Sequence, residues 1–62
     1  TPQEQEILKL IAEGYTNKEI AELIHRSVKT VQAHRARFME KLNLHDRTEI
    51  VRYAIRKGLI EA

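Results

Sequence analysis

The sequence predicts an all-α fold, a compact four-helix domain with helices at about residues 2–13, 17–24, 28–42 and 47–57. Composition is the first reason, because the 62-residue chain contains only two glycines and one proline, and no useful stretch alternates apolar and polar residues as a strand would. The second is a start signal, a capping residue followed three positions later by glutamate, that recurs along the chain. We expect residues 1–62 to form a single domain, since a chain this short builds only one small core.

Each predicted helix begins at a residue whose side-chain oxygen can accept a hydrogen bond from an unpaired backbone N–H group of the first turn. These caps are Thr1, Thr16, Ser27 and Asp46. Pro2 suits the first helical position. Glu4 completes the first start signal, and because it also lies on the buried side of its helix, pairing with Arg47 or another cation is a second role for it. Gly14 and Gly58 follow the first and last helices, where left-handed residues commonly end a helix.

Each helix has an apolar stripe when its residues are placed at intervals of about 100°. The residues predicted to face the core are Ile7, Leu8, Ile11, Ile20, Ala21, Ile24, Val31, Phe38, Leu42, Ile50 and Ala54. Val51 and Ile55 extend the stripe of the last helix to one side, where we expect partial exposure. They either finish the core or contact a second copy of the chain.

Charge is unevenly distributed along the chain. Residues 1–22 contain five glutamates and two lysines, whereas residues 23–39 contain no acidic residue and four cations. The four cations are Arg26, Lys29, Arg35 and Arg37. A basic run is most often a solvated helix face, but clustered positive charge is also the electrostatic footprint of a surface that binds nucleic acid or another anion.

A short helix, a three-residue turn and a longer helix with basic outward residues predict a helix-turn-helix at about residues 17–42. In that motif the second helix lies in the DNA major groove and reads base edges near its N-terminal end. Ala21 suits the small residue needed at the helix crossing, and His25 occupies the turn, where glycine is common. In the helix predicted at about 28–42, the face opposite the buried stripe consists of Lys29, Gln32, Ala33 and Ala36. Its two alanines let the helix approach another surface closely.

The chain contains, in this order, the motifs TPxExE-L, G-x-T-N-K-E-I-A, S-x-K-T-V-x-x-H, K-L and a final helix led by Arg-Thr. With these motifs it resembles the DNA-binding domain of LuxR-type transcription regulators over essentially all of its length. The resemblance is closest to the effector domains of NarL/FixJ-type response regulators. It implies a cytoplasmic, sequence-specific transcription regulator of a two-component system, with the third helix in the major groove of double-stranded DNA.

The resemblance also implies roles for individual residues. Those facing the bases would be Lys29, Gln32, Ala33 and Ala36. Those near phosphates would be Thr16, Asn17, Lys18, Ser27, Thr30, His34 and Arg37. Arg26 departs from the family, which often has an aliphatic residue at this position, and its charged end would reach a phosphate. Ala36 stands where relatives can have a long polar side chain, so we expect fewer direct base contacts there.

Further partners follow from the same resemblance. The family often forms a homodimer on DNA through the last helix, here about residues 47–57, with Val51 and Ile55 at the contact. An N-terminal receiver domain would control this effector domain in a full-length protein. RNA polymerase is a further candidate partner.

We expect no cofactor, no metal and no membrane contact. The chain has no cysteine, and no apolar run approaches the roughly 20 residues of a membrane span. The spacing of His25, His34 and His45 matches no compact ligand pattern. Because the sequence has no glycine-rich phosphate loop and no paired carboxylates in a plausible pocket, we expect no enzyme.

Two alternatives to a LuxR-type domain stay open. One is a sigma-factor-like promoter-reading domain, and the other is a protein-interaction helical module that meets an acidic partner.

Overall fold

The computed structural model describes residues 2–61 and confirms the all-α fold. The helices of this part of the chain are α1 (Pro2–Ala12), α2 (Asn17–Ile24), α3 (Val28–Leu42) and α4 (Arg47–Arg56). The predicted bounds agree with these to within one residue. The two differences are at the ends of α1 and α4, where residues 13 and 57 belong to the turn that follows. Thr1, the predicted cap of α1, lies outside the described residues.

A residue in the left-handed conformation follows each helix. These residues are Gly14 (φ 102°), His25 (φ 57°), Asn43 (φ 57°) and Gly58 (φ 73°). The two glycines end α1 and α4 as predicted, and glycine adopts this conformation without steric cost. His25 and Asn43 have a Cβ atom that makes the same conformation less favourable, although asparagine and histidine tolerate it better than most residues. The helix-turn-helix therefore turns at a non-glycine residue.

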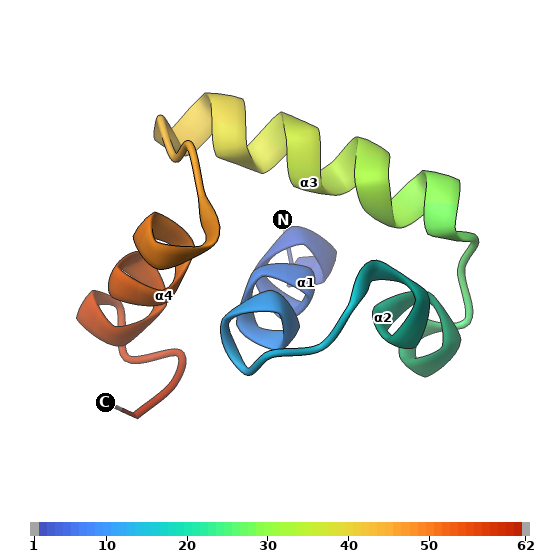
Figure 1. Ribbon diagram of the computed structural model, residues 1–62, viewed down its shortest axis with the longest axis horizontal. Coiled ribbons are helices and arrows are strands. Elements are labelled where there is room, and N and C mark those ends of the chain that lie inside the picture. Colours follow the sequence, from blue (N-terminus) through green and yellow to red (C-terminus); the bar gives the residue numbers. More distant parts are fainter. Residues whose placement is uncertain (1, 62) are drawn as a thin grey trace.

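α1 occupies the centre of the arrangement (Figure 1), and it packs against α2, α3 and α4. α3 lies across one side of the molecule above α1, and α2 and α4 flank α1 at its two sides. α2 also packs against α3, whereas within residues 2–61 the backbones of α3 and α4 stay apart. The fold consequently leaves the side of α3 that is turned away from α1 uncovered.

The core is formed by nine of the eleven residues predicted to face it, and these nine are at most 5% exposed. They are Ile7, Leu8, Ile11, Ile20, Ala21, Val31, Phe38, Ile50 and Ala54. Ile24 and Leu42, which were also predicted to face the core, are partly buried and pack against its edge. Each is the last residue of its helix, where the chain turns away and fewer neighbours cover the side chain.

The helices α2, α3 and α4, whose cap residues are described, each begin with a side-chain cap. Thr16 Oγ1 accepts a hydrogen bond from the Glu19 N–H group at 3.1 Å, and the Thr16 N–H group donates to Glu19 Oε1 at 2.9 Å, which completes the predicted capping box of α2. Asp46 accepts from the Glu49 N–H group at 2.9 Å. The Glu49 carboxylate reaches back to the N–H group of His45 rather than to that of Asp46, at 2.6 Å. The start of α4 is therefore a variant of the capping box.

The Asp46 cap provides a test of the fold that is independent of any ligand. Asp46→Ala should lower the free energy of unfolding by about 1 kcal/mol, because a backbone N–H group of the first turn of α4 loses its acceptor. In a domain of this size, that loss corresponds to a fall of roughly 4–8 °C in Tm. Thermal unfolding followed by circular dichroism measures it. Asp46→Asn keeps an acceptor oxygen and should retain most of the stability, so equal losses in both variants would contradict a hydrogen-bonding role for this residue.

Candidate nucleic-acid interface

The helix-turn-helix is formed by α2, α3 and the three residues between them. His25 is in the left-handed conformation, and the N–H group of Arg26 donates to the Ala21 carbonyl at 2.9 Å, which closes the end of α2. Ser27 then begins α3 by accepting from the Thr30 N–H group at 3.1 Å. Ala21 is buried, in agreement with the small residue predicted at the crossing of the two helices.

The outer face of α3 consists of Lys29, Gln32, Ala33 and Ala36, and all four are exposed. These are the residues that the sequence predicted for base contacts, and they lie on the side of α3 opposite the buried residues Val31 and Phe38. Two of the four have only a methyl side chain, so another surface can approach the helix axis closely there. Acidic side chains are absent from the described segment between Glu22 and Glu40.

The residues predicted to contact phosphates gather at the starts of α2 and α3 and along one edge of α3. Those that are exposed are Thr16, Lys18, Arg26, Ser27 and Arg37. Those that are half-buried are Asn17, Thr30 and His34. The first turn of a helix presents backbone N–H groups and the positive end of the helix dipole, which together favour an anion. The start of α3 lies at one end of the outer face, and the start of α2 lies beside Arg35 of α3.

The capping hydroxyl groups keep donor capacity in addition to their structural hydrogen bonds. Thr16 Oγ1 and Ser27 Oγ both accept from a backbone N–H group, which leaves the hydroxyl hydrogen of each able to donate. The hydroxyl groups of Ser27 and Thr30 lie 2.9 Å apart and share one hydrogen bond. One of their two hydrogens is then available to an incoming oxygen atom.

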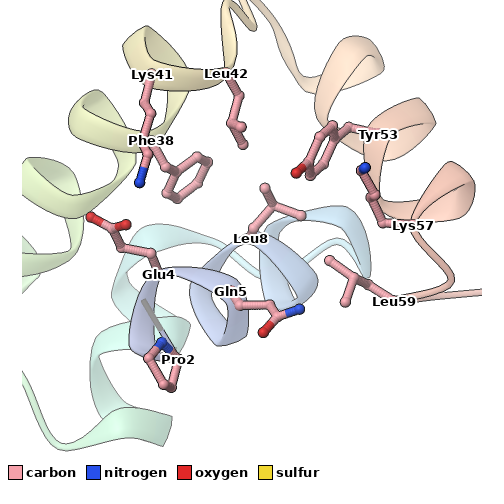
Figure 2. A pocket seen from close by; sticks show the side chains of 10 residues that line it. All are labelled: Pro2, Glu4, Gln5, Leu8, Phe38, Lys41, Leu42, Tyr53, Lys57 and Leu59. Atoms are coloured by element: carbon pink, nitrogen blue, oxygen red, sulfur yellow. The ribbon is translucent and has the colours of Figure 1, made fainter.

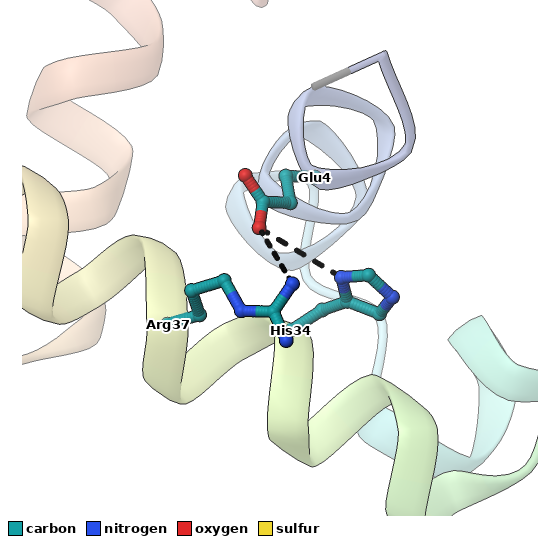
Figure 3. A network of polar contacts seen from close by, with 3 residues as sticks. All are labelled: Glu4, His34 and Arg37. Carbon is teal, nitrogen blue, oxygen red and sulfur yellow. Dashed lines mark ion pairs between the residues drawn. The ribbon is translucent and has the colours of Figure 1, made fainter.

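Glu4 of α1 lies behind α3 and faces two of the predicted phosphate-contacting residues (Figure 3). Glu4 is 6% exposed. Its Oε2 atom is 3.8 Å from His34 Nδ1 and 3.8 Å from Arg37 Nη1. Arg37 of α3 is therefore one cation beside this carboxylate, where the sequence suggested Arg47 or another cation. Burial raises the pKa of the Glu4 carboxyl, but the positive charges around it, Lys41 and Arg37 among them, hold that pKa below its ordinary value.

His34 is turned toward α1 by the same cluster. Its Nδ1 atom is buried, has no hydrogen-bond partner in the described structure and faces the Glu4 carboxylate, whereas the other ring nitrogen points away from Glu4 (Figure 3). A phosphate could therefore reach His34 only through that second nitrogen. Arg37 is different, because its side chain is 68% exposed and only one edge of it meets Glu4.

Arg35 is a residue of the interface to which the sequence assigned no role beyond its charge. Its Nη1 atom donates to Asn17 Oδ1 at 3.3 Å, so that a side chain of α3 holds a side chain at the start of α2. The sequence contains a signal for this contact. At about 100° per residue, Arg35 lies within about 40° of Val31, near the buried stripe of α3. A long cationic residue next to an apolar stripe needs a polar partner.

The last helix and a cavity beside it are lined or formed by residues other than the four of the outer face of α3. On α4, Val51 is half-buried and Ile55 is 37% exposed, as predicted. A cavity of about 560 Å³ lies between α1, the end of α3 and α4 (Figure 2), with Leu8, Phe38 and Tyr53 among its lining residues.

Within residues 2–61, no group of three or more acidic, histidine or cysteine side chains is placed to hold a metal ion. No helix of this part of the chain is both long and apolar enough to span a membrane.

Comparisons with known proteins agree with this geometry. The chain is 56% identical over 59 residues to the oxygen regulatory protein NreC of Staphylococcus carnosus, and the proteins of the same name from Staphylococcus epidermidis and Staphylococcus aureus match equally. Each match covers 95% of this chain but 27% of the relative, so the chain spans about a quarter of the length of these relatives. The family of bacterial regulatory proteins called the luxR family matches residues 1–54. With its helix-turn-helix and the four-helix arrangement around it, the chain belongs to the luxR family of bacterial regulatory proteins.

Proposed function

We propose that this chain is the DNA-binding effector domain of a bacterial two-component response regulator, and that it reads double-stranded DNA with α3 in the major groove. The observation that carries the proposal is the outer face of α3. It is exposed, it contains no acidic residue from Lys29 to Ala36, and it begins at the capped start of α3. Surfaces of this kind suit a polyanion whose grooves admit one helix.

Base reading depends on the four residues of the outer face. Gln32 has an amide that can pair with both the N6 and N7 positions of adenine, and Lys29 can donate to guanine. Ala33 and Ala36 offer methyl groups that suit the methyl group of thymine. Because only two of the four have long polar side chains, direct readout is concentrated at the first half of α3.

Backbone contacts position the helix in the groove. Thr16, Ser27 and Thr30 supply hydroxyl groups, and Lys18 and Arg26 supply charge from exposed positions. Such contacts to phosphates fix orientation and register but carry no sequence information. We include Asn17, His34 and Arg37 in this set, with His34 the most constrained because its Nδ1 atom faces Glu4.

The regulatory context is proposed from the relatives, which are longer than this chain. NreC proteins are named oxygen regulatory proteins, and the matched segment is about a quarter of their length. We infer that a receiver domain precedes this domain in a full-length cytoplasmic regulator and controls its access to DNA. RNA polymerase is a further proposed partner, and no catalytic activity is assigned to this domain.

Gln32→Ala tests groove reading. This change should reduce discrimination between preferred and scrambled duplexes by about 1–3 kcal/mol, because a bidentate base contact is lost. Fluorescence anisotropy titrations with duplexes selected from a random pool measure the two affinities. A selection that recovers the same motif with equal strength from the variant would contradict the proposed orientation of α3.

Lys18→Ala is the matched variant for phosphate contact. It should weaken all duplexes alike and lower the slope of log affinity against log salt by about 1, since one fewer phosphate is neutralised. The same titrations at four or five salt concentrations give this slope. If neither variant changes DNA affinity, α3 does not dock as proposed, and an interaction with an acidic protein becomes the better explanation of the basic segment.

Val51 and Ile55 provide the test of dimerisation through α4. An aspartate at either position should leave binding to a single half-site unchanged but weaken binding to paired half-sites by roughly tenfold or more, because the linked second contact is lost. Arg52→Ala, on an exposed part of the same helix, serves as the control. Binding to paired sites that is unaffected by Val51→Asp and Ile55→Asp would place the dimer contact elsewhere.

A further inference from the structure

The side chains of Arg35 and Asn17 join the two helices of the helix-turn-helix at its outer edge. Arg35 Nη1 donates to Asn17 Oδ1 at 3.3 Å, and the two residues are 18 positions apart in the sequence. Both are half-buried. Asn17 is the first residue of α2 and directly follows the cap Thr16. A side chain of the groove-facing helix is thereby tied to the helix start that offers donors to a phosphate.

This hydrogen bond determines which end of the Asn17 amide is free. A guanidinium group can only donate, so the atom of Asn17 that faces Arg35 has to be the carbonyl oxygen. The NH₂ group is then turned away from Arg35 with its donors unused by this contact. Without Arg35, the amide could rotate and present its oxygen atom, which a phosphate would repel.

The charge balance at the start of α2 favours an anion there. Lys18 brings positive charge close to the end of a helix that already carries a partial positive charge from its unpaired N–H groups. Glu19 offsets part of this charge, but its carboxylate is engaged with the N–H group of Thr16. A phosphate oxygen near Asn17 would meet the Thr16 hydroxyl group, the Asn17 NH₂ group and the charge of Lys18.

We propose that Arg35 is a positioning residue for DNA backbone binding, which holds the Asn17 amide with its NH₂ group toward a phosphate at the start of α2. The inference rests on the proposed DNA binding and deepens it. Arg35 acts through Asn17 and does not itself neutralise a phosphate. Its removal therefore costs an oriented donor rather than a charge contact.

The experiment compares DNA affinity and its salt dependence for Arg35→Ala, Asn17→Ala and the double variant, with Arg52→Ala as a control cation on α4. Each single change should weaken binding to a selected duplex by roughly tenfold, since a hydrogen bond to a charged oxygen is lost. The double variant should bind DNA as tightly as whichever single variant has the lower affinity, because the two residues act as one unit. The salt slope should stay unchanged in Arg35→Ala, in contrast to Lys18→Ala.

Asn17→Asp separates positioning from folding. An aspartate accepts from Arg35 as well as the amide does, so the Tm should be preserved, but it replaces the donors with a negative charge and should weaken DNA binding by more than tenfold. Arg35→Lys retains a donor and should recover part of the affinity lost in Arg35→Ala. These two variants decide the question if Arg35→Ala fails to fold.

Three results would overturn the assignment. One is an additive loss in the double variant, and another is a loss in Arg35→Ala no larger than in Arg52→Ala. The third is a fall of about 1 in the salt slope of Arg35→Ala, which would make Arg35 a direct phosphate contact. Failure of the unaltered chain to bind any duplex would instead refute the proposed function itself, so the two failures are distinguishable.

Discussion

Burial of α1 is the constraint on which the rest of the structure depends. Ile7 and Ile11 are fully buried and Leu8 is 2% exposed, and within the described residues α1 is the helix that packs against all three others. A 62-residue chain has little apolar area to spare, so one central helix serves as the common partner. α3 is consequently covered on one side only, and its other side is left to meet a ligand.

The hydroxyl groups that begin α2 and α3 have a structural role and a proposed binding role. Thr16 and Ser27 accept backbone hydrogen bonds that stabilise the starts of these helices, and we propose that both positions also contact phosphates. In that proposal stability and DNA binding are coupled, because removal of either hydroxyl group would affect both. The cap Asp46 lies at the start of α4 and is free of this coupling.

Local signals in the sequence predicted most of the fold, because caps and apolar periodicity act within one or two helical turns. They placed the helix bounds to within one residue and identified nine core residues. They did not show that Ile24 and Leu42 are only partly buried, because burial there depends on what lies beyond a helix end. They also missed the hydrogen bond between Arg35 and Asn17, since it depends on the angle at which α2 and α3 cross, and no short-range pattern encodes that angle. The residues of the outer face of α3 could be predicted from the sequence, whereas the polar contacts that hold α3 against α1 and α2 could not.

Those polar contacts matter because they add direction to the apolar packing of α3. The hydrophobic effect that buries Val31 and Phe38 is not directional, whereas a hydrogen bond depends on where its two atoms lie. Glu4 meets α3 from α1 on one side, through His34 and Arg37, and Arg35 ties α3 to α2 on another. Two directional contacts to two different helices restrict both rotation and sliding. A rotation of α3 by even a fraction of a turn would move Gln32 away from the base edge that we propose it reads, so the polar contacts beside the core help to fix the direction in which α3 presents its outer face.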